Sequence, residues 1–64
     1  MINLKIKEIR ERKNISKDYI AIQMEISIKK YDEIEKGKVD LKISELNLLG
    51  DILGVQKDVF FNML

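Results

Sequence analysis

The sequence predicts an all-α fold, a compact bundle of five short helices in a single domain over residues 1–64. Three observations predict it. Apolar residues recur at spacings of three and four, which places them on one face of a helix. No segment shows the alternation of apolar and polar residues typical of a strand, and no proline interrupts the helical pattern. Short polar segments with serine, asparagine or glycine separate the helices.

The first helix is expected over about residues 3–13, with isoleucines on one face and charged residues on the other. Asn14 follows it and suits the left-handed conformation in which many helices end. The second helix is expected to begin after Ser16, a favoured N-cap residue, and to run to about Met24.

A short turn of Glu25 and Ile26 separates the second helix from the third. Ser27 is expected to cap this third helix, over about residues 28–36, and Gly37 to end it. Two helices joined by a tight turn form a unit whose second helix can lie in a groove of DNA. A positive φ at Glu25 would add roughly 1 kcal/mol of strain.

The fourth helix is expected over about residues 43–53. Its N-cap would be Lys42, a poor capping residue, so this end is expected to fray or to borrow Asp40 or Ser44. Gly50 stands in the middle of the helix, at a cost of about 1 kcal/mol relative to alanine. We expect another helix to pack closely against its bare backbone.

Gly54 ends the fourth helix, and a short fifth helix is expected over about residues 57–62. The apolar faces of the helices predict one shared core. We expect it to contain Ile6, Ile9, Ile20, Ala21, Met24, Ile26, Tyr31, Ile34, Ile43, Leu46, Leu49, Ile52, Leu53 and Val55.

Composition limits the classes of function. The chain has neither Cys nor His, so it lacks a disulfide framework and the usual zinc ligands, and we expect no metal site. With no glycine-rich phosphate loop and no serine in a pattern with a base, an enzyme is not expected, and neither is a cofactor or a small-molecule ligand. No apolar run is long enough to cross a bilayer and no signal-peptide pattern opens the chain, so we expect a cytoplasmic protein.

Charge is distributed unevenly although the net charge is only +1. Residues 1–20 hold six basic and three acidic residues, a net +3. Residues 21–40 hold four basic and five acidic, and residues 41–64 two basic and three acidic, a net −1 in each case. A domain that binds nucleic acid tightly is usually more basic, although a local patch can do the same work.

A known pattern matches the chain without gaps from about residue 4 to residue 61. Its most specific part is the I-E-K-G-K run at 34–38, together with I-S at 15–16 and I-A at 20–21. With these residues the chain resembles the Cro/phage-repressor (XRE-type) helix-turn-helix family. The resemblance implies a lambda-repressor-like domain and a transcriptional regulator of bacterial or phage type, whose recognition helix at 28–36 lies in the major groove of double-stranded DNA.

The resemblance also implies roles for individual residues. The positions that match the family's base-reading sites are Ile28, Lys29 and Glu33. The positions in or near its phosphate contacts are Lys17, Lys30, Lys36, Lys38 and Lys42. The family pairs an arginine of the first helix with a glutamate that ends the third, which here are Arg10 and Glu35.

The recognition helix departs from ordinary DNA-binding chemistry in one respect. It carries two adjacent carboxylates, Asp32 and Glu33. Glu33 suits readout of cytosine, whereas we expect Asp32 to point outward or toward the phosphates and to repel them. Lys29 and Glu33 could equally form an ordinary i,i+4 pair on a solvated face.

A unit of this size offers few phosphate contacts, so we expect a homodimer on two half-sites. The candidate dimer residues lie in the apolar tail and are Phe61, Met63 and Leu64, while Phe60 is expected to cap the core. The alternative function is a protein-interaction module of the same fold, such as an antitoxin or a partner of a regulator, with weak or no DNA binding.

Overall fold

The computed structural model describes residues 2–56 and 58–61, without the side chain of Phe61. This part of the chain contains five helices and no strand: α1 (Ile2–Arg12), α2 (Lys17–Met24), α3 (Ile28–Glu35), α4 (Ile43–Leu53) and α5 (Asp58–Phe61). The predicted all-helical bundle is confirmed. The radius of gyration is 10.5 Å, close to the value of about 10.7 Å expected for a folded chain of 64 residues.

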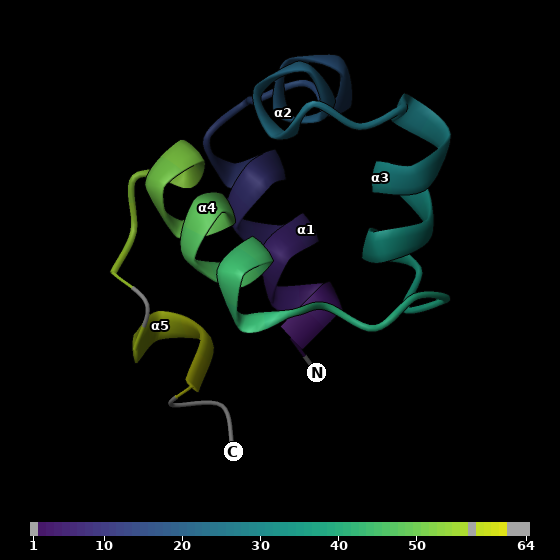
Figure 1. Cartoon of the computed structure of the whole chain (residues 1–64). Coiled ribbons are helices and arrows are strands. Elements are labelled where there is room, and N and C mark those ends of the chain that lie inside the picture. The colour runs from purple at the N-terminus through teal and green to yellow at the C-terminus, as the bar shows by residue number, and fades with distance from the viewer. Residues whose placement is uncertain (1, 57, 62–64) are drawn as a thin grey trace.

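The helices surround α1, which runs through the middle of the molecule in Figure 1. α3 packs against both α1 and α2, while α4 contacts α2 and α5 contacts α1. The start of α1 and helix α5 both lie in the lower half of Figure 1, away from the segment that joins α2 to α3 at the top. None of the helices in the described part has the length and apolar character needed to cross a membrane.

The core draws on every helix. Its largest fully buried side chains are Ile6, Ile20, Tyr31, Ile34, Leu49, Leu53 and Phe60. The prediction that Ile43 belongs to the core is wrong, because 68% of its surface is exposed. It lies on the same face of α4 as Leu46 but one turn earlier, where no described element covers it. Ile26, Ile52 and Val55 are half-buried and pack against the edge of the core.

The first four helices all end in the same way. The residue after the last turn adopts positive φ, at Asn14, Glu25, Gly37 and Gly54. In each case the next residue donates its backbone N–H to the carbonyl five residues earlier: Ile15 to Arg10, Ile26 to Ala21, Lys38 to Glu33 and Val55 to Gly50, at 2.9–3.1 Å. These are Schellman motifs, which satisfy carbonyl groups that the helix itself leaves unpaired.

Glu25 is the residue least suited to this conformation. Its φ of 59° and ψ of 41° lie in the left-handed region, where a Cβ atom crowds the following carbonyl. Glycine has no Cβ, and asparagine tolerates the region better than glutamate does. The turn between α2 and α3 therefore carries the strain of about 1 kcal/mol that a positive φ at this position predicts.

The starts of the helices are capped by side chains. The Oγ atoms of Ser16 and Ser27 accept hydrogen bonds from Tyr19 and Lys30 backbone N–H groups, at 3.1 and 3.0 Å. α4 starts differently, because the Lys42 side chain has no acceptor atom. Glu45 Oε1 instead accepts from the Lys42 backbone N–H at 2.9 Å, so the expected contribution of Asp40 or Ser44 is replaced by a residue of the first turn.

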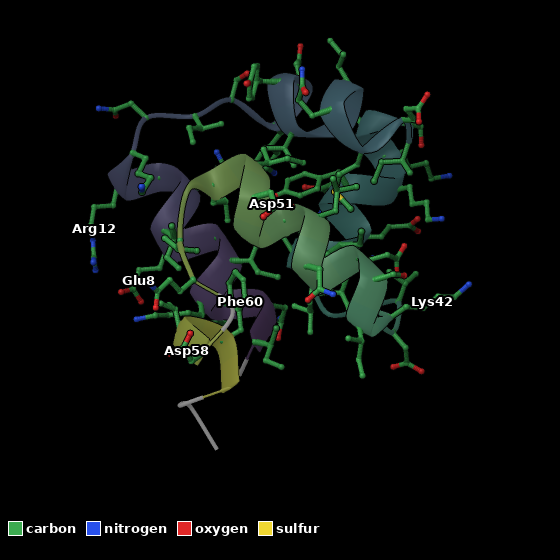
Figure 2. All side chains as sticks on the ribbon, turned by 60° about the vertical axis from the view of Figure 1, so that its left-hand side comes forward. Glu8, Arg12, Lys42, Asp51, Asp58 and Phe60 are labelled. Atoms are coloured by element: carbon green, nitrogen blue, oxygen red, sulfur yellow. The ribbon has the colours of Figure 1, made fainter. Side chains whose placement is uncertain are left out.

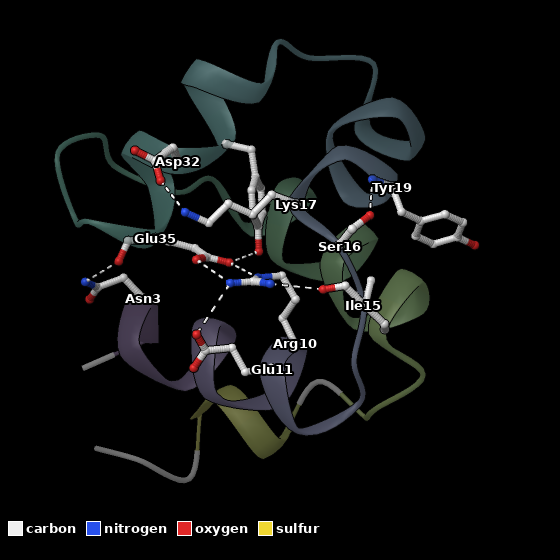
Figure 3. Close-up of polar contacts among 10 residues, drawn as sticks. Asn3, Arg10, Glu11, Ile15, Ser16, Lys17, Tyr19, Asp32 and Glu35 are labelled. Atoms are coloured by element: carbon white, nitrogen blue, oxygen red, sulfur yellow. Dashed lines mark hydrogen bonds and ion pairs between the residues drawn. The ribbon is translucent and has the colours of Figure 1, made fainter.

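A buried ion pair joins α1 to the end of α3 (Figure 3). Arg10 Nε donates to Glu35 Oε2 at 2.6 Å, and Arg10 Nη2 donates to Glu35 Oε1 at 3.3 Å. The third guanidinium nitrogen, Nη1, donates to the carbonyl of Ile15 at 3.0 Å, which ties down the loop before α2. Arg10 and Glu35 are 8% and 4% exposed, so water does little to weaken these contacts. The pair implied by the resemblance is present in the structure.

Tyr31 and Asn3 complete this cluster. The buried Tyr31 hydroxyl donates to Glu35 Oε2, and burial together with this hydrogen bond raises the pKa of Tyr31 far above its usual value. The hydroxyl therefore stays protonated and keeps donating. Asn3 Nδ2 donates to the Glu35 carbonyl at 3.2 Å. A side chain at Gly37 would make the end of the Asn3 side chain shift, since its Cβ would lie 2.9 Å from Asn3 Nδ2.

Gly50 is covered by the last part of the described chain. A Cβ atom at residue 50 would lie 3.2 Å from the Val55 carbonyl oxygen and 3.7 Å from a ring carbon of Phe60. The expected close packing of a helix is thus provided by α5, through Phe60, and by the loop that leads to it. Phe60 is fully buried, in agreement with its expected role as a cap on the core (Figure 2).

Removing Glu35 is expected to destabilise the fold severely. Glu35→Ala leaves the buried Arg10 guanidinium with only the exposed Glu11, 3.9 Å from its Nη2 atom, as a counter-ion, and the expected loss is about 3–5 kcal/mol in the free energy of unfolding. The triple variant Arg10→Met, Tyr31→Phe, Glu35→Leu replaces the whole polar cluster by apolar groups and is expected to lose much less. Urea denaturation followed by circular dichroism measures both. Equal losses in the two variants would contradict this account.

Relieving the strain at the α2–α3 turn is expected to stabilise the fold. Glu25→Gly should raise the free energy of unfolding by about 1 kcal/mol, because glycine adopts positive φ without a Cβ clash. Asn14→Gly, at the matching position after α1, should give a smaller gain. Thermal and urea denaturation measure the stability of the two variants. A larger gain in the free energy of unfolding for Asn14→Gly than for Glu25→Gly would be evidence against backbone strain at Glu25.

Candidate nucleic-acid interface

The exposed face of α3 is set by what the helix buries. Tyr31, Ile34 and Glu35 point into the molecule. At 100° per residue, Lys29 and Glu33 then lie on the side opposite the core. Lys29 is exposed and Glu33 half-buried. Ile28 stands at the edge of this face, with 49% of its surface exposed at the start of the helix. The three predicted base-reading residues are thus on the accessible side of α3.

Four of the five predicted phosphate-contacting lysines fall into two groups, one on either side of this face. Lys17, the first residue of α2, and Lys36 line a groove with Lys7 of α1 and with Asp32. Lys30 and Lys42 line a second groove, which also contains Asp40 and Glu45. Lys38, also exposed, lies in the loop after α3.

Asp32 joins the lysines of the first group. Its Oδ1 atom lies 2.5 Å from Lys17 Nζ, and its Oδ2 atom lies 2.7 Å from Lys36 Nζ (the contact with Lys17 is drawn in Figure 3). The expectation that Asp32 points outward or toward the phosphates is not contradicted, because its half-buried carboxylate lies between two of the lysines predicted to contact phosphates. The expected repulsion of phosphates stays a prediction. The Asp32 carboxylate lies between the start of α2 and the end of α3, because one oxygen contacts Lys17 and the other contacts Lys36.

These contacts change the acid–base properties of the carboxyl group. The hydrogen bonds from Lys17 and then Lys36 lower the pKa of Asp32 to about 2, and the same contact raises the pKa of Lys36. Asp32 is consequently ionised throughout the neutral range. The contact between Asp32 and Lys36 could be predicted from the sequence, because the two residues are at i and i+4. The contact between Asp32 and Lys17 could not be predicted in this way, because the two residues are fifteen positions apart and lie on different helices.

The other candidate residues make no such pairs. Within the described part of the chain, Lys29, Lys30, Lys38 and Lys42 have no carboxylate within 4.0 Å. The possible i,i+4 ion pair between Lys29 and Glu33 is therefore absent. The described residues also contain no cluster of three or more acidic, His or Cys side chains that could hold a metal ion. The exposed face of α3 therefore presents one apolar side chain, Ile28, and has lysines on both of its sides.

The structure does not describe the side chains of the three residues predicted to form a dimer contact. The side chain of Phe61 and the whole of Met63 and Leu64 lie outside the described residues. Exposed apolar side chains do occur elsewhere, at Tyr19 and Ile22 on the outer side of α2, which are 51% and 71% exposed.

The effect of Lys17 on Asp32 is directly measurable. In Lys17→Met, the pKa of Asp32 should rise from about 2 toward its usual 3.8, because its principal hydrogen-bond donor is lost. A lowered pKa stabilises the folded state above about pH 4 and loses that effect as the pH falls toward 2, so acid destabilisation should be weaker in the variant. An NMR titration of the Asp32 carboxyl carbon measures the shift. Lys30→Met, in the other groove, is the control and should leave it unchanged.

Known proteins provide no further guide to this face. The chain matches no protein-family model, and comparison with curated proteins and with solved structures finds no match. The residues and their geometry therefore carry the functional argument alone.

Proposed function

We propose that the chain is a sequence-specific, double-stranded DNA-binding transcriptional regulator with a lambda-repressor-like helix-turn-helix. In this proposal α2 and α3 form the helix-turn-helix, and α3 is the recognition helix. The observation that carries the proposal is the exposed face of α3 with a group of lysines on each side of it. A recognition helix needs this arrangement, because base edges lie in the groove and phosphates line both of its walls.

The start of α3 supports readout of bases. Ser27 caps the helix, and the next two residues, Ile28 and Lys29, are exposed. Lysine can donate to guanine O6 and N7, and an apolar side chain can contact the methyl group of thymine. Glu33, one turn further along, can accept a hydrogen bond from cytosine N4. The major groove is about 12 Å wide and admits a helix of this kind.

The dimensions of the domain favour two copies on one site. Successive major grooves on one side of DNA are about 34 Å apart. The longest dimension of the domain is 28 Å, so one copy reaches only one of these grooves. Two copies, each with α3 in a groove, would also double the number of phosphate contacts. We therefore propose a homodimer on a two-part operator.

A second candidate is the protein-interaction module of the same fold. The ion pairs of Asp32 and the exposed Tyr19 and Ile22 favour it. Salt dependence separates the candidates, because binding to DNA releases counterions and weakens by about 0.9 log units per phosphate contact for each log unit of salt. Absence of any binding to duplex DNA at low salt would leave the interaction module as the better reading.

Lysines at the start of α3 are expected to carry DNA binding. Lys29→Ala together with Lys30→Ala should abolish binding to an operator selected from a random duplex pool, because the pair includes a base contact and a phosphate contact. Fluorescence anisotropy over a range of salt concentrations measures the affinity. Circular dichroism should show an intact fold, since both side chains are exposed.

The matched control removes two cations elsewhere. Arg12→Ala together with Lys13→Ala changes the net charge equally, at the exposed end of α1 (Arg12 is labelled in Figure 2, on the opposite side of the molecule from Lys42). This variant should keep most of the operator affinity. Equal losses in both double variants would show that net charge, and not the face of α3, governs binding.

A further inference from the structure

The Asp32 carboxylate occupies the place that a phosphate group would take between two lysines. It lies 2.5 Å from Lys17 Nζ and 2.7 Å from Lys36 Nζ, on the two sides of one carboxylate. Lys7 lines the same groove. Two lysines on either side of an oxyanion, with a third in the same groove, would be a phosphate-binding arrangement if the oxyanion came from DNA. Here the chain supplies it from its own recognition helix.

The contact engages both lysines with one carboxylate. The Asp32 side chain is 26% exposed and those of Lys17 and Lys36 are 37% and 58% exposed, so each pair is a modest interaction that salt weakens. A DNA phosphate can bind Lys17 or Lys36 only by replacing the carboxylate, which then stands unpaired beside a second negative charge. Asp32 does not lose its negative charge by protonation at neutral pH, since its pKa is about 2.

The two groups of lysines therefore differ in what they offer. Lys30 and Lys42 on the other side of α3 have no carboxylate within 4.0 Å in the described part of the chain, whereas Lys17 and Lys36 are both engaged. Glu35, the remaining acidic residue that lines the first groove, is buried and paired with Arg10. Asp32 is thus the group whose removal would release cations on this side.

We propose that Asp32 is an internal competitor of the DNA backbone, which keeps affinity low by engaging Lys17 and Lys36. This inference rests on the proposed DNA-binding function. It predicts that the chain binds DNA more weakly than its lysines would allow, and that one uncharged substitution restores the missing contacts. Binding then depends strongly on how many copies of the domain assemble on one site.

The test is the salt dependence of binding to random-sequence duplex DNA, measured by fluorescence anisotropy for the full chain. Asp32→Asn keeps the shape of the side chain and removes its charge. If both lysines then reach phosphates, the log–log slope should steepen by about 1.8 per copy of the domain. The ratio of affinities at 50 and 200 mM salt should consequently grow about 12-fold over that of the unaltered chain for each copy bound.

Two further variants make the result specific. Glu25→Gln removes one exposed negative charge at the α2–α3 turn but releases no lysine, so it should raise affinity slightly and leave the slope unchanged. The triple variant Lys17→Gln, Asp32→Asn, Lys36→Gln should return the slope to that of the unaltered chain. Thermal denaturation of each variant checks that the fold is retained.

The outcomes separate this inference from the proposed function. If the unaltered chain binds and Asp32→Asn shows only the effect of Glu25→Gln, the internal competition is overturned while DNA binding stands. If only Asp32→Asn binds, the competition is supported in its strongest form. If neither chain binds duplex DNA at low salt, both proposals are wrong.

Discussion

The buried ion pair between Arg10 and Glu35 is the contact on which the arrangement of this small domain depends. Its guanidinium reaches α3 through Glu35 and the loop before α2 through the Ile15 carbonyl, so one side chain positions three segments. Burying two charges is costly, and the cost is offset only because every polar atom of the cluster has a partner. With Tyr31 and Asn3 completing the set, α3 has one orientation against α1. That orientation determines which residues of α3 face outward.

The electrostatic character of the outer face follows from which charges are already engaged. A net charge of +1 says little, because several acidic residues are paired internally: Glu35 with Arg10, Asp32 with Lys17 and Lys36, and Glu8 with Lys5 and Arg12. Surface pairs of this kind contribute little to stability, whereas they decide which cations remain available to a partner. On α3 the available cations are Lys29 and Lys30. Within the described residues, a near-neutral chain can thus present lysines without ion pairs on one side of α3 and lysines paired with Asp32 on the other.

Local features of the sequence predicted most of the fold. The amphipathic pattern of α4 predicted its bounds, and Ser16, Ser27, Asn14, Gly37 and Gly54 marked helix ends because capping depends on residues within one turn. Contacts between distant segments were less accessible. Periodicity placed Ile43 on the apolar face of α4. It does not indicate whether a neighbouring helix extends far enough to cover that residue, and none does in the described part of the chain. The partner of Asp32 on α2 could not be read from spacing either, and that contact changes the interpretation of the candidate site most.

Phe60 has a consequence for how the domain forms during synthesis. Its ring closes the core over Gly50, and α5 packs against α1, the first helix of the described chain. The earliest and latest helices of the described chain therefore depend on each other, and their contact spans most of the sequence. Such long-range contacts form late, because the intervening chain must be ordered first. Helices α1 to α4 can collapse as they emerge from the ribosome, but the core stays open on one side until residue 60 has been released.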